Sequence, residues 1–442
     1  MEQDGIMKEI IIPGSKSITN RVLLLAAIGE TPVTLHNLLE SDDTVHMRGV
    51  LSGFGVQFDK TGDKSLLVTP PTQLRGDDQS HFIGNAGTVA RFVSAVSLII
   101  QGNYGLNGVD RMHERPQGDL FVALRQLGVS VTCEGTAGFL PAQYEGLGGE
   151  LAERTVTLSG RVSSQFVSAL LLVAPRIKGG LRIEMDEIPP SQPYVDMTLE
   201  ILRHWGVSFT TEEGGRVMDI AEGLTAPAVY TIPADMSGAS YPSAWSTLSQ
   251  HPLRIRDYGS VTLQGDEGFA DICAHFGATV QKDGEDCSFS DFGASGAATT
   301  FDFSPMPDVA MTGMAMACFY EGDWKFEGLE SLRVKECDRI QAMVDGFTQL
   351  GIRTVVEGDD VTISGGTYWQ SADNLARLQA ADIETNSHDD HRIAMCFGVL
   401  RSALAQSSGT SAESLFTIGE PHCVAKTWPE FWTDLADWEA SV

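Results

Sequence analysis

Lys16, Ser17 and Arg21 stand at the start of a predicted apolar helix, directly after Pro13-Gly14-Ser15. Ser17 and Arg21 are four positions apart and therefore share one face of that helix. Free backbone N–H groups, the positive end of the helix dipole and two cationic side chains together favour a bound phosphate or carboxylate. An ordinary capped helix with solvated basic residues is the alternative for this segment. A Walker A loop is excluded, because Gly14 and Lys16 are not adjacent.

The same arrangement recurs at the starts of other predicted helices. Gly87 and Arg91 are four positions apart at one of them, and Gly87 has no side chain that would keep a ligand from the backbone. Asp308 opens another helix, where an ordinary N-cap is the alternative. For Lys335 and Arg339, a solvated i,i+4 charge pattern is the alternative.

The basic residues at equivalent positions are Lys16, Arg21, Arg91, Arg115, Lys335, Arg339, Arg392 and Lys426, with Asp308, Glu336 and His391 among them. If these helix starts converge, they form a strongly cationic cleft that contains isolated carboxylates. Such a cleft suits more than one multiply charged anion, with proton transfer as its chemistry.

The run His388-Asp389-Asp390-His391 contains side chains that can bind metals. Adjacent residues at a helix start diverge by about 100°. No cysteine or third histidine stands at useful ligand spacing either. We therefore expect no metal site there.

A repeat positions these helix starts. An apolar residue, a glycine and a further apolar residue recur with glycines at Gly55, Gly128, Gly206, Gly277 and Gly351. Successive glycines are 73, 78, 71 and 74 positions apart (128−55, 206−128, 277−206, 351−277). Glycine is typical of the end of a helix from which the chain turns into a strand.

The first helices of the repeats are expected at 20–28, 91–100, 165–174, 240–248, 309–319 and 391–399, which makes six units, the last without the glycine marker. Each unit is predicted to be roughly βαβαββ. One unit cannot cover its own apolar faces, so several must pack together. The sequence therefore predicts an α/β protein of two domains with three units each, and a boundary within 225–234.

Composition limits the class of protein. A chain of 442 residues is expected to form two domains of about 200 residues. A net charge of −29 argues against binding to nucleic acid or anionic membranes. The excess of acidic residues is explained by simple solubility, and adaptation to a salty habitat is the alternative.

No apolar run reaches the roughly 20 residues of a membrane span, and the first residues lack the features of a signal or transit peptide. Seven scattered cysteines without a CxxC pair favour reduced thiols in a cytoplasm.

Short motifs are spread in order over nearly the whole chain: PGSKSITNR (13–21), GNAGT (84–88), RMHERP (111–116), VSSQF (162–166), PD (307–308), RVKECDR (333–339), DHRIAMCF (390–397) and KT (426–427). Together they resemble the 5-enolpyruvylshikimate-3-phosphate synthase family, the 3-phosphoshikimate 1-carboxyvinyltransferases. The resemblance implies an α/β fold (α+β repeats) of the inside-out α/β barrel type, with two domains of three βαβαββ units and an active site in the interdomain cleft. It also implies a C-terminal domain of residues 1–14 plus 233–442, which includes the N-terminal strand, and an N-terminal domain of residues 15–232.

The resemblance further assigns residues to the substrates. Shikimate 3-phosphate is expected at Lys16, Ser17, Arg21, Ser163, Ser164, Gln165, Ser191, Asp308, Ser331 and Lys335. Phosphoenolpyruvate is expected at Lys16, Gly87, Arg115, Gln165, Arg339, Arg392 and Lys426. The shikimate 5-hydroxyl adds to C2 of phosphoenolpyruvate while C3 is protonated, and the tetrahedral intermediate then loses phosphate. Asp308 is expected to be the base, Glu336 the acid, and Lys16 to assist both transfers.

No metal or organic cofactor is implied, because lysines and arginines supply the positive charge. The expected partners are the two small-molecule substrates, with no nucleic acid and no membrane. The protein is expected to be a monomeric cytoplasmic transferase of the shikimate pathway, which leads to chorismate and the aromatic amino acids.

Two alternatives come from different classes of protein. The sister enolpyruvyl transferase that acts on UDP-N-acetylglucosamine has Lys-Asn where this chain has Lys16-Ser17, and a loop cysteine near the position of Arg115. No cysteine lies between residues 1 and 132 here. A non-catalytic binding protein built on the same repeats should have lost some of the charged cleft residues. This chain keeps all six of them: Lys16, Asp308, Glu336, Arg339, His391 and Arg392.

Overall fold

The chain folds into two compact units, which are described separately. The computed structural model describes residues 7–159, 163–189, 191–259 and 264–441. The N-terminal unit contains Gly14–Pro233, and the C-terminal unit contains Met1–Pro13 together with Ala234–Val442. Each unit has its own hydrophobic core. Residues 1–6 of the expected N-terminal strand and Val162 of the VSSQF motif lie outside the described residues.

Three repeats build the N-terminal unit. The first contains α1 (Lys16–Ile28), β2 (Val33–His36), α2 (Asp42–Gly53), β3 (Gln57–Gly62) and β4 (Ser65–Thr69). The second contains β5 (Ser80–Phe82), α3 (Gly87–Val96), β6 (Gln101–Asn107), α4 (Asp110–Glu114), α5 (Gly118–Gln126), β7 (Ser130–Cys133) and β8 (Ala142–Leu147). The third contains β9 (Thr155–Leu158), α6 (Ser164–Val173), β10 (Leu181–Met185), α7 (Pro193–His204), β11 (Phe209–Glu212) and β12 (Val217–Ile220), and β13 (Val229–Thr231) follows it.

The sheets of this unit share one strand order. The first strand of each repeat pairs in parallel with the second, and the fourth strand lies between the second and the third. The orders are β5-β6-β8-β7, β9-β10-β12-β11 and β13-β2-β4-β3. β13 therefore supplies the first strand of the first repeat, although it is the last strand of the unit in sequence.

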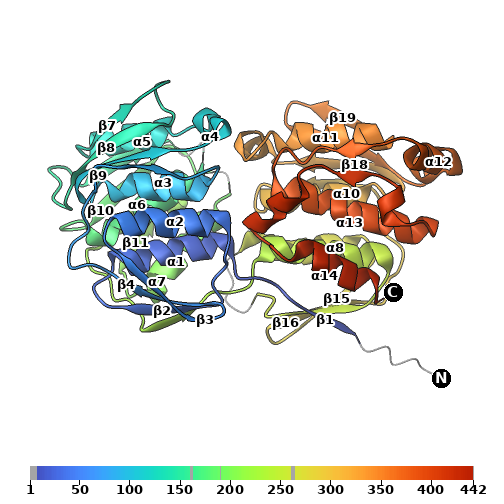
Figure 1. The fold of residues 1–442 in the computed structure, drawn as a ribbon, viewed down its shortest axis with the longest axis horizontal. Helices are drawn as coiled ribbons and strands as arrows, with labels where there is room; N and C mark the ends of the chain where they lie inside the picture. Colours follow the sequence, from blue (N-terminus) through green and yellow to red (C-terminus); the bar gives the residue numbers. More distant parts are fainter. Residues whose placement is uncertain (1–6, 160–162, 190, 260–263, 442) are drawn as a thin grey trace. The chain divides into compact units, whose positions relative to one another are not determined.

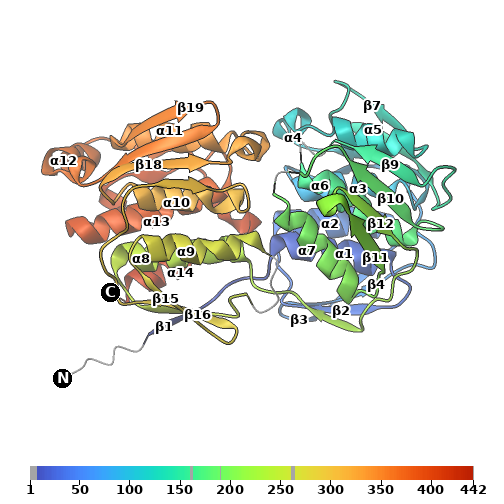
Figure 2. The same ribbon diagram turned by 180° about the vertical axis from the view of Figure 1, so that it is seen from behind.

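In the N-terminal unit, α1, α3 and α6 lie in the interior and the sheets lie outside, whereas α2, α5 and α7 each have exposed residues (Figures 1 and 2). α1, α3 and α6 pack on one another, and nearly all of their residues are buried. Each of these helices contains a long apolar run, because none of its faces meets water along that run. The four-stranded sheets stay open, so the described residues form no closed barrel.

The C-terminal unit repeats this plan. Its first repeat contains β1 (Lys8–Ile11), α8 (Met236–Ser249), β14 (Leu253–Arg256), the 3-10 helix η3 (Gly265–Gly268), α9 (Phe269–His275), β15 (Thr279–Asp283) and β16 (Asp286–Ser290). The next contains β17 (Thr300–Asp302), η4 (Pro307–Val309), α10 (Ala310–Ala317), β18 (Gly322–Glu327), η5 (Glu330–Val334), α11 (Arg339–Leu350), β19 (Arg353–Glu357) and β20 (Asp360–Gly365). The last contains α12 (Ala372–Ala380), β21 (Glu384–Thr385), α13 (His391–Ser408), β22 (Thr417–Ile418), η8 (Pro421–Lys426) and α14 (Phe431–Glu439).

The strand order is again first, second, fourth, third in β1-β14-β16-β15 and β17-β18-β20-β19. β1 pairs in parallel with β14, so the strand nearest the N-terminus is part of this unit. α8, α10 and α13 pack on one another as the interior helices.

The last repeat differs from the expected βαβαββ unit. Its sheet contains only β21 and β22 among the described residues. The repeat ends instead in α14, whose Phe431, Leu435 and Trp438 are buried at helical spacing. α14 packs on α13. These large apolar side chains favour a helix that covers α13.

The marker glycines end helices, as their positions in the sequence predict. Each marker glycine follows the second helix of a repeat and has a positive φ, for example 99° at Gly128 and 83° at Gly351. Only glycine adopts this conformation without strain, so the residue ends the helix and turns the chain into the next strand. Three of the first helices, α1, α3 and α8, begin four residues before the expected starts, because the residues that precede each apolar run are themselves helical. α6 begins one residue early, α13 begins at the expected residue 391, and α10 begins at Ala310, one residue late.

Candidate functional site

Seven charged residues of the C-terminal unit form one network, which we name the carboxylate–cation cluster: Asp308, Lys335, Glu336, Arg339, Asp390, Arg392 and Lys426. They come from η4, the segment between η5 and α11, the first residue of α11, the start of α13 and the end of η8. Helix starts therefore position most of the cluster, as the sequence predicts. Four cations face three carboxylates, so the cluster retains a positive charge.

Asp308 lies among three cations. Lys335 Nζ is 3.0 Å and Arg339 Nη1 is 3.1 Å from its Oδ1, and Arg392 Nη2 is 3.2 Å from its Oδ2. Burial alone would raise the pKa of Asp308, but attraction by the three cations outweighs burial and holds that pKa well below its ordinary value. Asp308 is therefore an ionised carboxylate at neutral pH, as a general base must be.

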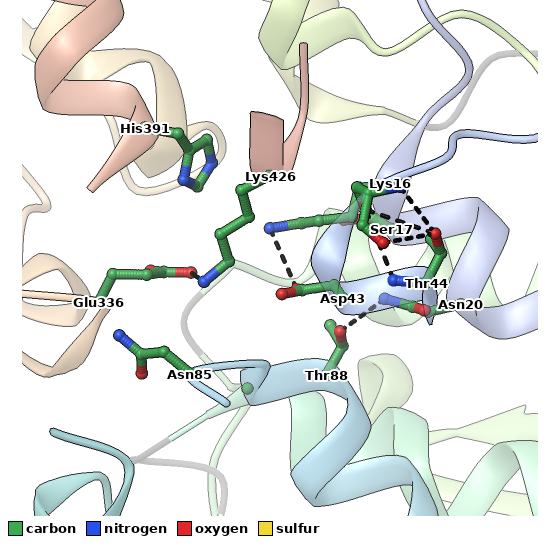
Figure 3. Close-up of polar contacts among 12 residues, drawn as sticks. Lys16, Ser17, Asn20, Asp43, Thr44, Asn85, Thr88, Glu336, His391 and Lys426 are labelled. Atoms are coloured by element: carbon green, nitrogen blue, oxygen red, sulfur yellow. Dashed lines mark hydrogen bonds and ion pairs between the residues drawn. The ribbon is translucent and has the colours of Figure 1, made fainter. Parts of the chain in front are cut away.

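Glu336 shares a cation with Asp308. Arg339 Nη2 is 3.0 Å from its Oε2, and Lys426 Nζ is 3.0 Å from its Oε1. Figure 3 shows Lys426 extended toward this carboxylate. Glu336 is only 7% exposed, so both contacts lie in a setting where charge interactions are strong. They stabilise the ionised form of Glu336.

Arg339 is the centre of the cluster. Besides Asp308 and Glu336, it reaches Asp390 through Nε at 2.7 Å and Nη2 at 3.2 Å. Burial would lower the pKa of Arg339, but Asp390, Glu336 and Asp308 together raise it above its ordinary value. Asp390 is also the N-cap of α13, where it accepts a hydrogen bond from the backbone N–H of Arg392. Asp390 thus fixes both arginines.

His391 is fully buried at the first position of α13. Its Nδ1 is 3.6 Å from Asp390 Oδ1. Among the residues that the structure describes, no group of three or more histidine, cysteine or acidic side chains is arranged to hold a metal ion.

In the N-terminal unit, Lys16 occupies the first position of α1 and points toward Asp43 of α2, with 3.6 Å between Nζ and Oδ2 (Figure 3). Lys16 is 8% exposed. Asn20 of α1 donates a hydrogen bond to Thr88 of α3 at 2.8 Å. The N-terminal ends of α1 and α3 are therefore held side by side.

Arg21 is buried without a carboxylate partner among the described residues. Its guanidinium donates to Thr198 Oγ1 at 2.8 Å, to the carbonyl of Ser17 at 2.8 Å and to the carbonyl of Tyr194 at 3.1 Å. The ring of Phe92 lies 5.2 Å from its central carbon. Burial lowers the pKa of Arg21 to about 10. This side chain joins α1 to α7, which the sequence does not indicate.

Gly87 lies against two guanidinium groups. A Cβ on Gly87 would come 2.7 Å from Arg91 Nη1 and even closer to Arg115 Nη2. Arg91 donates to the carbonyl oxygens of Gly87 and Pro116, and Arg115 Nη1 donates to the carbonyl of Asn85 at 2.8 Å. Gly87 and Arg115, both expected at phosphoenolpyruvate, are thus neighbours in the structure.

The expected serines lie at helix starts. Ser163 is the N-cap of α6 and accepts a hydrogen bond from the backbone N–H of Gln165 at 3.2 Å. Ser164 is buried and Gln165 is half-buried. Ser191, shortly before α7, has a φ of 62°, a left-handed conformation that is strained for a non-glycine residue.

The structure brings some of the expected residues together and leaves others apart. All expected site residues of the C-terminal unit except Ser331 belong to the cluster. Ser331 lies in η5, and its buried hydroxyl has no hydrogen-bond partner among the described residues. The sequence did not single out Asp43 as the partner of Lys16 or Asp390 as the partner of Arg339, because both pairs join residues far apart in the chain.

No described helix is both long and apolar enough to cross a membrane.

Comparisons with known proteins show the family of this chain. A sequence model of the EPSP synthase family (3-phosphoshikimate 1-carboxyvinyltransferase) matches residues 2–435. The 3-phosphoshikimate 1-carboxyvinyltransferase of Cellvibrio japonicus is 36% identical over 422 residues, which cover 95% of this chain and 94% of that protein. That of Bordetella avium is 36% identical over 431 residues, which cover 95% and 93%. A solved EPSP synthase from Acinetobacter baumannii has a similar fold, with a TM-score of 0.74 at 23% identity over 98% of this chain and 96% of the other. The chain therefore belongs to the EPSP synthase family.

Proposed function

We propose that this protein transfers the enolpyruvyl group of phosphoenolpyruvate to the 5-hydroxyl of shikimate 3-phosphate and releases phosphate. Its membership of the family supports this reaction, since the curated relatives are named for it. The observation that carries the proposal is the environment of Asp308, a carboxylate held in its ionised form by three cations. The addition step needs a base beside positive charge, and this carboxylate meets both needs.

The cations around Asp308 also bind the two substrates. Lys335 binds shikimate 3-phosphate, whereas Arg339 and Arg392 bind phosphoenolpyruvate. As these cations turn toward the substrate anions, they hold Asp308 less strongly, so its pKa rises toward the ordinary value. A carboxylate with a less depressed pKa is a better base. Substrate binding would therefore activate Asp308.

Competition between substrate and carboxylates for the same cations also explains how Glu336 becomes an acid. Its partners Arg339 and Lys426 are both assigned to phosphoenolpyruvate, so bound substrate competes for them. Once they leave, Glu336 is a buried carboxyl that faces substrate anions, and both conditions favour its protonated form. It can then deliver a proton to C3.

The reaction balances with these groups. The 5-hydroxyl gives its proton to Asp308 as its oxygen bonds to C2, and C3 takes a proton from Glu336. In the second step Glu336 takes a proton back from C3, the double bond forms again, and the C2–oxygen bond to phosphate breaks. Phosphate leaves with the proton that Asp308 had accepted. Lys16 assists both proton transfers.

We propose that residues of the N-terminal unit act on the same two substrates. Shikimate 3-phosphate is bound by Lys16, Ser17, Arg21, Ser163, Ser164, Gln165 and Ser191, with Asp308, Ser331 and Lys335 from the C-terminal unit. Phosphoenolpyruvate is bound by Lys16, Gly87, Arg115 and Gln165, with Arg339, Arg392 and Lys426 from the C-terminal unit. Several of these side chains lie at the starts of helices, where free N–H groups and the helix dipole favour anions.

We further propose that the protein works as a monomer in the cytoplasm, without a metal or organic cofactor. Every residue assigned to a substrate comes from one chain. All seven cysteines are free thiols, which suits a reducing compartment.

The test is phosphate release from purified protein given both substrates in a buffer without metal. We expect release only when both substrates are present, and a loss of about 10²- to 10⁴-fold in Asp308→Asn. Asp345→Asn is the matched control, because Asp345 is an exposed carboxylate of α11. Equal rates for Asp308→Asn and wild type would exclude Asp308 as the base. Turnover with UDP-N-acetylglucosamine instead would assign the chain to the sister reaction.

A further inference from the structure

Asp266 is a buried carboxyl of the C-terminal unit that the mechanism above does not use. It lies in η3 and is 4% exposed. The hydroxyl of Ser237, in the first turn of α8, donates to its Oδ2, whereas its Oδ1 has no hydrogen-bond partner among the described residues. An ionised carboxylate in such a place is costly, since one of its oxygens is neither solvated nor paired.

Asp266 lies close to the proposed base. η3 packs against η4, which carries Asp308. The end of η3 meets the start of η4 where a Cβ on Gly268 would lie 3.3 Å from Met306 Sδ. The charged and titratable groups that face Asp266 are Asp235 at the N-cap of α8, Tyr258, Asp308 and Arg392 of α13.

The environments of Asp266 and Asp308 shift the pKa values of the two carboxyls in opposite directions. Burial, followed by repulsion from Asp308, raises the pKa of Asp266 to about 7, and Arg392 and Ser237 oppose this rise only in part. The pKa of Asp308 lies well below its ordinary value. Neighbouring carboxyls whose environments separate them in this way are suited to different roles in proton transfer.

We propose that Asp266 is a positioning residue that acts on Asp308 through its charge, and that ionisation of Asp266 strengthens Asp308 as a base. Three cations hold Asp308 and make it a weak base. A negative charge on Asp266 opposes those cations and increases the affinity of Asp308 for the substrate proton. This inference rests on the proposed function and adds a residue to it.

The test is the pH profile of kcat for phosphate release, from about pH 5 to about pH 9, in wild type and Asp266→Asn. We expect kcat of the wild type to rise through an inflection near pH 7, where Asp266 ionises. Asp266→Asn should lose that inflection and keep the lower rate throughout, because asparagine carries no charge. Coincident profiles would overturn the inference.

Two further variants separate charge from structure. Ser237→Ala removes the hydroxyl that stabilises ionised Asp266, so the inflection should move to higher pH. If the Ser237–Asp266 contact only supported the fold, its loss would not shift the inflection. An unshifted inflection in folded Ser237→Ala would therefore overturn the inference, even if Asp266→Asn failed to fold. Glu267→Gln, at the neighbouring half-buried carboxyl, should keep the wild-type profile.

An inactive wild-type enzyme would overturn the proposed function and this inference with it. An active enzyme whose inflection is insensitive to both Asp266→Asn and Ser237→Ala would overturn the inference alone.

Discussion

Single residues of the carboxylate–cation cluster neutralise one another before any substrate arrives. Asp308, Glu336 and Asp390 occupy the donors of Arg339, and Lys426 pairs with Glu336. A buried charge needs an opposite charge or several hydrogen bonds, because without them it would cost several kcal/mol. The internal carboxylates therefore keep the cations in place, and anionic substrates must compete with them.

The acid in the cluster can be tested through Glu336→Gln. We expect kcat to fall by about 10²- to 10⁴-fold, because glutamine cannot deliver a proton to C3. Solvent deuterium should also no longer enter the methylene group of phosphoenolpyruvate during turnover, as followed by mass spectrometry. The control is Glu330→Gln, at an exposed glutamate of η5. Undiminished deuterium incorporation in Glu336→Gln would assign the proton to another group.

The absence of a side chain at Gly87 can be tested by Gly87→Ala. The new methyl group would lie 2.7 Å from Arg91 Nη1 and closer still to Arg115, so both guanidinium groups must move. We expect KM for phosphoenolpyruvate to rise roughly 10- to 100-fold, the range that a displacement of about 1 Å can produce. Steady-state kinetics with each substrate varied in turn would check this. An unchanged KM would show that Arg115 does not depend on an empty position at Gly87.

The depressed pKa of Asp308 also predicts how stability depends on pH. A carboxyl with a lower pKa in the folded state stabilises that state above its unfolded value of about 3.9, and this contribution is lost as pH falls through the folded value. Asp308→Asn should therefore be less stable than wild type at pH 7, with a smaller difference as the pH falls below about 4. Urea unfolding at a series of pH values measures this difference. A difference that stays constant over the acid range would contradict the prediction.

At the scale of elements, helix packing places the charged groups. α11 carries Arg339 at its first residue, and α13 carries Arg392 in its first turn. α11 packs on α13, with Gly346 facing the ring of Phe397. The contact between these two helices therefore fixes the spacing of two arginines of the cluster.

We expect Gly346→Ala to destabilise the protein by about 1–3 kcal/mol, because the added methyl group overpacks this contact. Its Cβ would come 2.9 Å from Phe397 Cε1. Gly49→Ala is the matched control, since Gly49 is an exposed glycine of α2 with nothing within 4 Å of an added Cβ. That change should stabilise its helix by roughly 0.5–1 kcal/mol. Calorimetry of the thermal unfolding of both variants measures this difference. Changes in melting temperature of the same sign in the two variants would contradict overpacking at Gly346.

At the scale of the whole molecule, charge is distributed unevenly. The chain carries a net charge of −29, whereas the carboxylate–cation cluster is positive. Long-range repulsion in such an acidic protein opposes the compact state, and salt screens it beyond roughly 8–10 Å. The buried ion pairs of the cluster are screened much less.

Raising KCl from about 0.05 M to about 0.5 M should therefore raise the melting temperature. The same salt should raise KM for both substrates, because it weakens the attraction between the cluster and multiply charged anions. Calorimetry and steady-state kinetics in the same buffers provide the two measurements. A melting temperature that falls with salt would show that attractive surface pairs outweigh the net repulsion.

Much of the fold could be predicted from the sequence because its signals are local. The glycine after the second helix of five repeats requires a left-handed conformation, and the apolar runs of α1, α6 and α10 require burial on every side. The last repeat was less predictable. Whether its chain continues into two more strands or into α14 depends on how Phe431 and Trp438 pack on α13, which is a tertiary contact.

The residues of the candidate site divide in the same way. Their types and positions at helix starts predicted by themselves a group of cations and a few carboxylates suited to anionic substrates, and the structure brings the members from the C-terminal unit into contact. Only the tertiary structure decided the partners: Asp43 for Lys16, Asp390 for Arg339, and the neutral oxygens around Arg21. The physical reason is that burial and charge interactions act over distances in space. The two partners of such a pair can lie dozens of residues apart in the chain, so no local sequence pattern predicts their contact.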